Sequence, residues 1–300
     1  MQLIKASLLA GLFLVAISPL TSAALAQTAP AATPGETIEL LDPDLTRWEI
    51  WMGVPHETVE GLPAGTYQSD NVHKGTPMGL GNDPKQVFTM IEEDGTPVLY
   101  VTGEIYGGIT TLESFGDYHL SMDFKWGDKK WAPRLNAKRD SGLLYHCYGD
   151  HGAFWKTWKA CLEFQIQEKD FGDFIGLAGP TALVRGTKED GKIKKYDPTA
   201  DTLHRTGGYT QASHEPDKPN GEWNRLDLYV LGDRAVHMVN GEIVMVLIDA
   251  RDGDGNPLTE GQIQLQSEAA ECYYKNIRLT PITAADLPPE VAELIVGIDP

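Results

Sequence analysis

The amino-acid sequence predicts an all-β fold, a β-sandwich of antiparallel strands joined by long loops. Residues 118–126 alternate strictly between apolar and polar side chains, and a period of two is typical of a strand with one buried face. Asn240-Gly241 lies between two apolar runs and favours a two-residue hairpin, because both turn positions need positive φ. Long helical periodicity and internal repeats are missing, which excludes helical bundles, solenoids and propellers.

The individual strands follow from the same alternation, punctuated by glycine and proline. Before residue 97 the chain is rich in Gly, Pro and Asp, and there we expect an edge strand at 39–41 followed by long loops. Residues 185–222 are expected to form a long excursion with a turn at 187–191, and residues 288–295 favour a short helix. The other strands are expected at 87–90, 98–102, 118–126, 161–168, 225–231, 235–239, 242–248, 261–267 and 272–279.

The first 26 residues have the features of a signal peptide. Lys5 gives a positive start, Leu8 to Ile17 form a short apolar run, and Ala24-Leu25-Ala26 is a small-x-small cleavage site. A membrane anchor, the alternative, needs about 20 apolar residues, and Ser18-Pro19 interrupts this run. We therefore predict a periplasmic or secreted protein with a linker at 27–37, a sandwich domain at 38–285 and a C-terminal tail at 286–300.

Charge and cysteine content limit the partners. The formal charge of −18 argues against nucleic acid and anionic lipid and favours a neutral ligand. No second apolar stretch is long enough to span a membrane, no motif requires a cofactor, and no residue set is assigned to a metal. Cys147, Cys161 and Cys272 are too few for a disulfide scaffold. Export permits one bridge between Cys147 and Cys161, and three buried thiols are the equal alternative.

Polar side chains gather on one face of two predicted strands. Glu163, Gln165 and Gln167 alternate with Leu162, Phe164 and Ile166, and a second run alternates in the same way, with its amides at Gln262, Gln264 and Gln266. Amide side chains both donate and accept hydrogen bonds, which suits sugar hydroxyls. The alternative is an ordinary solvent-facing sheet surface.

Residues 145–158 add aromatic and imidazole groups beside this polar face. Trp155 and Trp158 are predicted either to stack against sugar rings or to plug the end of the sandwich core. His146 and His151 are candidates for acid/base groups or metal ligands, and hydrogen-bonded loop histidines are the alternative. Their spacing fixes no third metal ligand.

Glu163 and Glu168 are a candidate carboxylate pair. A glycosidase needs two carboxyls on either side of one bond. Glu168 shares the face of Glu163 only if a bulge precedes it; otherwise it faces the core side or a loop.

The chain resembles the 3-keto-disaccharide hydrolase domain family, whose fold is a concanavalin-like lectin/glucanase jelly roll. The likeness extends over about residues 38–282 and is a set of short motifs in order. They are Gly107-Gly108, Phe115-Gly116-Asp117-Tyr118, Asp140-Ser141-Gly142-Leu143-Leu144-Tyr145, Glu163-Phe164-Gln165-Ile166-Gln167, Gly221-Glu222-Trp223-Asn224, Val239-Asn240-Gly241, residues 261–266 and Lys275-Asn276-Ile277.

The resemblance implies a glycoside whose glucose unit is oxidised at C3. A ketone at C3 acidifies the hydrogen at C2, so a base can remove it and the C1 oxygen can depart by elimination, with water adding afterwards. We expect Glu163 or His146 as the base, His151 as an acid or metal-linked group, and Gln165, Gln167 and Gln266 as hydroxyl-binding groups.

Two alternatives remain open. A carbohydrate-binding module would use the same polar face without turnover. An ordinary glycoside hydrolase would act on unoxidised glycan, but related glucanases carry Glu-x-Asp-x-x-Glu where this chain has Gln165 in the middle position.

Overall fold

Strand β7 (Tyr118–Lys130) shows how the predicted alternation builds the core. The computed structural model describes residues 35–298. His119, Asp123 and Lys125 of β7 are partly exposed. The apolar side chains between them are at most 2% exposed, namely Tyr118, Leu120, Met122, Phe124 and Trp126.

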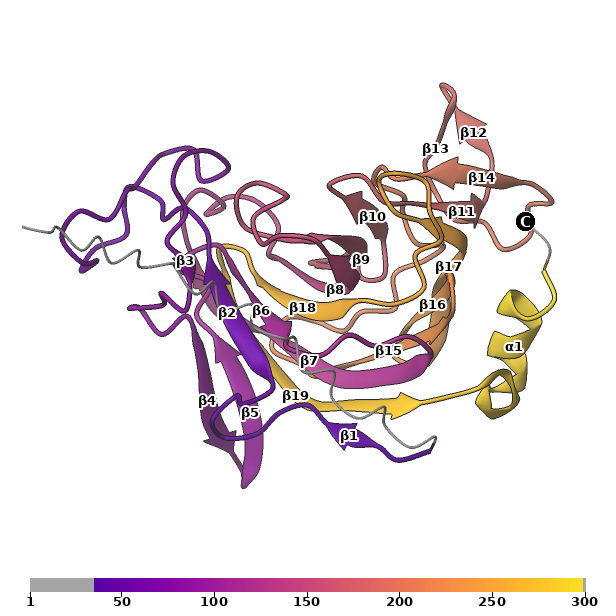
Figure 1. Ribbon diagram of the computed structural model, residues 1–300, viewed down its shortest axis with the longest axis horizontal. Helices are drawn as coiled ribbons and strands as arrows, with labels where there is room; N and C mark the ends of the chain where they lie inside the picture. The colour runs from indigo at the N-terminus through magenta and orange to yellow at the C-terminus, as the bar shows by residue number, and fades with distance from the viewer. Residues whose placement is uncertain (1–34, 299–300) are drawn as a thin grey trace, which may run out of the picture. The chain divides into compact units, whose positions relative to one another are not determined.

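Two antiparallel sheets pack face to face, and β7 lies in the larger one (Figure 1). The larger sheet runs in the order β14 (Leu203–Thr206), β11 (Thr181–Arg185), β17 (Glu242–Arg251), β16 (Arg234–Val239), β15 (Asn224–Leu231), β7, β19 (Ala270–Pro281), β5 (Thr96–Val101) and β4 (Phe88–Glu93), with β1 (Ile38–Glu39) also paired to β19. The smaller sheet runs β10 (Phe174–Leu177), β9 (Ala160–Gln167), β8 (Asp140–Tyr148), β18 (Gln262–Ser267), β6 (Gly107–Thr111), β2 (Trp48–Met52) and β3 (Gly79–Leu80).

The core lies between the sheets. Leu143, Phe164 and Leu265 of the smaller sheet and Leu120 and Leu228 of the larger sheet belong to one buried cluster. In Figure 1 the smaller sheet follows the inner side of the curved larger sheet, which leaves its other face available for a site. The predicted all-β fold, a sandwich of antiparallel strands joined by long loops, is therefore confirmed.

The predicted hairpin at Asn240-Gly241 is present between β16 and β17. Both residues have positive φ, 52° for Asn240 and 86° for Gly241, as a two-residue turn requires. The Asn240 side-chain oxygen also accepts a 2.9 Å hydrogen bond from the backbone N–H of Arg225. This bond connects the turn to β15, the strand beside β16 in the sheet.

Strands β6 and β8 escape prediction because apolar and polar side chains do not alternate along them. All five residues of β6 are buried, and so are eight of the nine residues of β8. Strand β9 is as deeply buried but keeps the alternation. Strands β2 and β3 lie in the region expected to be loops. The turn predicted at 187–191 is shorter in the structure: Asp190 and Gly191 join β12 (Lys188–Glu189) to β13 (Lys192–Ile193).

The described chain ends in two helical segments, η1 (Ala284–Asp286) and α1 (Pro289–Ile295). Val291 and Ile295 of α1 are fully buried and join the main core. Among residues 35–298, no helix has the length and apolar character needed to cross a bilayer. The predicted signal peptide and most of the linker lie outside the described residues.

Candidate functional site

The open face of the smaller sheet carries three rows of side chains across β9, β8 and β18. In the first row Asp140 lies between Gln167 and Glu268. In the second row Gly142 pairs with Gln165, and it shares the face of the first row because side chains two residues apart on a strand point the same way.

The third row completes this face. Leu144 of β8 lies between Glu163 of β9 and Gln264 of β18. Rows on one face are about 6.6 Å apart along a strand. The polar side chains of these rows therefore converge on one face, whereas Gln262 lies beyond a register shift and donates a 2.7 Å hydrogen bond to the carbonyl of Thr111.

Gly142 allows two of these side chains to meet at the centre of the face. A methyl group at position 142 would lie 2.3 Å from Oε1 of Glu163 and 2.7 Å from Oε1 of Gln266. Real Cβ atoms do not approach oxygen this closely, so the missing side chain at 142 leaves the space that Glu163 and Gln266 occupy.

A pocket of about 340 Å³ opens above the rows, within the range of small-molecule sites. Six of the residues predicted from sequence line it, namely Trp155, Trp158, Glu163, Gln165, Gln167 and Gln266. Seven further lining residues were not predicted, namely Arg134, Asp140, Phe154, Ile175, Leu177, Tyr209 and Glu268.

Arg134 holds two carboxylates at one end of the pocket. Its NH2 lies 2.5 Å from Oδ2 of Asp140 and its NH1 lies 3.1 Å from Oε1 of Glu268. Gln167 also donates a 2.7 Å hydrogen bond from Nε2 to the same Asp140 oxygen. One oxygen of Asp140 is thus fixed, and the other is free to act.

Burial changes the acidity of all three pocket carboxyls. Desolvation raises the pKa of Asp140 to about 6, against an opposing effect of Arg134. Desolvation and the nearby charge of Asp140 raise the pKa of Glu163 well above its ordinary value, and that of Glu268 is raised by the same two causes. The guanidinium of Arg134 pairs with only two of these three buried carboxyls, Asp140 and Glu268, so all three do not ionise together near neutrality.

Four buried polar atoms of the pocket have no hydrogen-bond partner within residues 35–298. Three are acceptors, Oδ1 of Asp140, Oε1 of Gln165 and Oε1 of Gln266, and one is a donor, Nε of Arg134. Buried polar groups in native proteins are nearly always hydrogen-bonded. A ligand rich in hydroxyl groups would supply the missing partners.

The two predicted tryptophans have different environments. Trp158 is 1% exposed, and its indole N–H donates a 3.0 Å hydrogen bond to the carbonyl of Gly107. Trp155 is 39% exposed and stacks on His73 with ring centroids 3.8 Å apart. Trp158 therefore anchors the loop from inside, whereas Trp155 presents an aromatic surface.

The structure keeps His146 out of the pocket, contrary to the sequence expectation of a base. Strict alternation from Leu144 would place it on the open face, but β8 has a bulge here and His146 has φ of 50°. Its Nε2 lies 3.2 Å from the carbonyl of Gly232, in the turn between β15 and β16. Burial lowers the pKa of His146 to about 4.

His151 also lies outside the pocket lining. Its Nε2 is 2.9 Å from Oε1 of Glu49, and its ring stacks on Trp51 at 5.3 Å. The predicted acid or metal-linked role therefore lacks support from the geometry.

Glu168 does not form a carboxylate pair with Glu163. It pairs with Arg139 at 3.4 Å and accepts a 2.6 Å hydrogen bond from Asn220. It is not among the pocket residues. The arrangement that an ordinary two-carboxylate glycosidase would take from these two glutamates is not formed.

Metal and cysteine chemistry have little support in the described part of the chain. No group of three or more His, Cys, Asp or Glu side chains within residues 35–298 is arranged to hold a metal ion. All three cysteines fall in this range, and each is a buried free thiol. The structure therefore has the three buried thiols and not the Cys147–Cys161 disulfide.

A family model described as a 3-keto-alpha-glucoside-1,2-lyase-like domain matches residues 37–280. No curated protein matches the chain.

Among solved structures, a provisionally assigned glycosyl hydrolase from Parabacteroides distasonis is 16% identical, with 82% of this chain and 100% of that chain covered and a TM-score of 0.43. LamAcat from Zobellia galactanivorans is 12% identical over 83% of this chain and 97% of that chain, with a TM-score of 0.40. The carbohydrate-binding module CBM66 from Bacillus subtilis is 14% identical over 64% and 91%, with a TM-score of 0.38.

Proposed function

The chain belongs to the 3-keto-alpha-glucoside-1,2-lyase-like domain family, and from this premise we propose that its open-face pocket cleaves glycosides whose glucose ring carries a ketone at C3. Family membership makes it a carbohydrate-active protein. The observation that supports the pocket as the site is the set of buried acceptors without protein partners, on Asp140, Gln165 and Gln266.

Asp140 is the proposed base. Its Oδ1 has no protein partner, while Arg134 and Gln167 hold Oδ2. A general base is most effective when its pKa lies near the working pH, and that of Asp140 is raised to about 6. Asp140 removes the proton from C2, and the electrons move onto the C3 oxygen as an enolate.

Glu163 is the proposed acid, which reverses the role expected from sequence. A carboxyl whose pKa is raised well above its ordinary value keeps its proton and can donate it. Glu163 gives this proton to the C1 oxygen as the C1–O bond breaks. Arg134, whose buried Nε has no protein partner, is suited to hold the C3 oxygen while negative charge develops there.

Water completes net hydrolysis. Ionised Glu163 removes a proton from water as its oxygen adds to C1, and Asp140 returns a proton to C2. If water does not add within the pocket, the product is the unsaturated ketone of a lyase. Gln165, Gln167 and Gln266 bind ring hydroxyls in both cases.

The decisive experiment is turnover of a 3-keto-disaccharide in D2O, with the unoxidised disaccharide as comparison. Asp140 exchanges the proton taken from C2 with solvent before it returns one, so elimination and hydration place deuterium at C2 of the product, whereas direct displacement at C1 leaves hydrogen there. NMR of the product at partial conversion, corrected for exchange without enzyme, distinguishes the two routes. We expect deuterium at C2 and no turnover of the unoxidised sugar.

Variants test the assigned roles. Asp140→Asn and Glu163→Gln are expected to lower kcat by about 10²–10⁴, the usual contribution of an acid or base, with sugar binding retained. Glu168→Gln, outside the pocket, is the matched control and keeps wild-type kcat. Tight sugar binding without any turnover by the wild type would instead indicate a carbohydrate-binding module, and turnover of the unoxidised sugar an ordinary glycosidase.

A further inference from the structure

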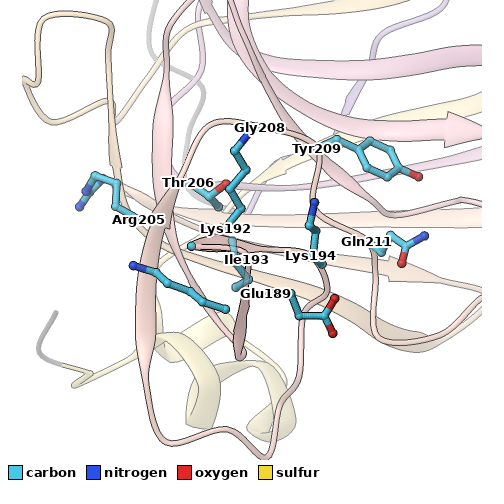
Figure 2. Close-up of a pocket in the computed structure, with 11 residues that line it drawn as sticks. Glu189, Lys192, Ile193, Lys194, Arg205, Thr206, Gly208, Tyr209 and Gln211 are labelled. Atoms are coloured by element: carbon cyan, nitrogen blue, oxygen red, sulfur yellow. The ribbon is translucent and has the colours of Figure 1, made fainter.

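A second and larger pocket, of about 830 Å³, lies beside the first. The β12–β13 hairpin and residues 205–211 form its walls (Figure 2). Figure 2 shows Lys192 and Lys194 between Arg205 on one side and Tyr209 on the other. Four basic side chains line this cationic pocket, Lys188, Lys192, Lys194 and Arg205, against one acidic side chain, Glu189.

The lysines of the cationic pocket are not neutralised by the protein. Arg205 is engaged, because it donates hydrogen bonds to the carbonyl of Asp249 at 2.9 Å and to its carboxylate. Lys188, Lys192 and Lys194 have no ion-pair partner among residues 35–298, and all three are exposed. Unpaired positive charge gathers here in a chain whose net charge is −18.

Tyr209 joins this pocket to the proposed active site, since it lines both. It lies on a segment that continues the smaller sheet beyond β10. Gly176 of β10 donates a 3.0 Å hydrogen bond to Gly207, and Phe174 and Thr210 exchange two backbone hydrogen bonds of 2.9 Å. A ligand in the active site that extends past Tyr209 therefore enters the cationic pocket.

We propose that the cationic pocket binds an acidic leaving group, a sugar acid whose carboxylate faces Lys188, Lys192 and Lys194. This inference rests on the proposed function and adds its substrate class. Lysine ammonium groups are strongly hydrated point charges on flexible stems, which suits a carboxylate in an open pocket. The net charge of the chain favours a neutral ligand, but the local charge of the cationic pocket is positive. At this pocket we therefore expect an anionic group.

Paired substrates test the subsite. 3-Keto-maltose and 3-keto-maltobionate share the oxidised ring and differ mainly in the leaving group, which is neutral glucose or anionic gluconate. We expect the wild type to have the lower KM for 3-keto-maltobionate. The triple variant Lys188→Gln/Lys192→Gln/Lys194→Gln is expected to raise that KM about tenfold, as a few exposed ion pairs together allow, and to leave the KM for 3-keto-maltose within about twofold.

The control is a second triple variant with the same change in net charge, Lys74→Gln/Lys129→Gln/Lys169→Gln, whose positions line neither pocket. It is expected to keep the preference for the acid. High salt is expected to weaken the preference in the wild type, since the Debye length falls from about 10 Å at 0.1 M to about 3 Å at 1 M. Equal effects of the two triple variants would overturn the subsite and leave the proposed function intact.

Binding separates the two proposals. Calorimetry with unoxidised maltobionate and maltose needs no turnover, so it reports on the subsite even if neither 3-keto sugar is cleaved. Tighter binding of maltobionate, lost in the pocket variant and kept in the control variant, supports the subsite. Equal affinity for both sugars contradicts it.

Discussion

At the scale of single residues, Gly142 determines how the proposed acid reaches the substrate. Its neighbours Glu163 and Gln266 occupy the space that any side chain at 142 would take. The glycine lies in a strand without positive φ, so its role is close approach and not backbone conformation.

Gly142→Ala is expected to lower kcat/KM for the 3-keto-disaccharide by about 10²-fold, because displacing a reacting group by about 1 Å costs this much. Gly116→Ala is the matched control, since its added Cβ meets its nearest neighbour at an ordinary 3.6 Å. Steady-state kinetics and melting temperature distinguish displacement from unfolding. Equal activity of both variants would contradict the proposed position of Glu163.

The pH dependence of kcat/KM follows from the same residues. Asp140 acts when ionised, so activity is expected to rise with pH and to level off above about 6, where its pKa lies. Glu163 acts when protonated, and its pKa is raised, so activity falls again at higher pH and the profile is bell-shaped.

Arg134→Gln tests the acid limb of this profile. Arg134 lowers the pKa of Asp140, so the variant is expected to move the acid limb to higher pH. Glu168→Gln should leave both limbs in place. An unchanged acid limb in Arg134→Gln would remove Asp140 as the base.

At the scale of elements, the loop between β8 and β9 is anchored to the smaller sheet by hydrogen bonds. Trp158 fixes it from below through its hydrogen bond to Gly107. The backbone N–H of Lys159 donates a 3.2 Å hydrogen bond to Gln264, whose Nε2 in turn donates to Thr110 at 2.7 Å. Gln264 is therefore a structural residue, whereas Oε1 of Gln266 has no hydrogen-bond partner among residues 35–298.

The two tryptophans of this loop are expected to respond differently to truncation. Trp158→Ala creates a cavity and should lower the free energy of unfolding by about 3–5 kcal/mol. Trp155→Ala removes an exposed ring and should change stability by less than about 1 kcal/mol while raising KM severalfold, in line with the modest energy of aromatic stacking. Urea unfolding and KM measure the two effects; a large stability loss in Trp155→Ala would show that this ring is structural too.

At the scale of the whole molecule, His237 links the two sheets through a buried polar network. Its Nε2 accepts a 2.9 Å hydrogen bond from Tyr145 of the smaller sheet, and its Nδ1 donates to the carbonyl of Gly172 at 3.0 Å. Burial lowers its pKa to about 4. The unfolded chain binds a proton there below about 6.5, and the folded chain does not.

We therefore expect neutral His237 to contribute about 3 kcal/mol to the free energy of unfolding above about pH 6.5. This contribution is lost as the pH falls from 6.5 through 4. Asp140 and Asp173, with pKa values raised to about 6, oppose this loss, because their burial is less costly once they are protonated. The double variant Tyr145→Phe/His237→Leu should reduce the slope of unfolding free energy against pH between 6.5 and 4. An unchanged slope would show that His237 does not titrate with unfolding.

Export is also a property of the whole chain, and we propose it from residues 1–26, which lie outside the described structure. The mature protein is expected to begin at Gln27, after the Ala24-Leu25-Ala26 cleavage site. Mass spectrometry of the protein from the periplasm or medium of the producing cell measures this end directly. A cytoplasmic protein that retains Met1 would contradict it.

What could be read from the sequence by itself was local. The alternation along β7, β9 and β18, the Asn240-Gly241 turn and the shared face of Glu163 and Gln165 follow from the two-residue period of a strand, which neighbouring residues set alone. Strand β8, by contrast, carries no such period.

Only the tertiary structure decided the chemistry of the site. Arg134 and Glu268 are 134 residues apart, and their meeting with Asp140 depends on how three segments pack. The bulge that turns His146 away from the pocket, and the burial that raises the pKa of Glu163, come from the same packing. The reason is that acidity and orientation depend on the surrounding dielectric and on distant charges, and a linear pattern of residue types contains neither.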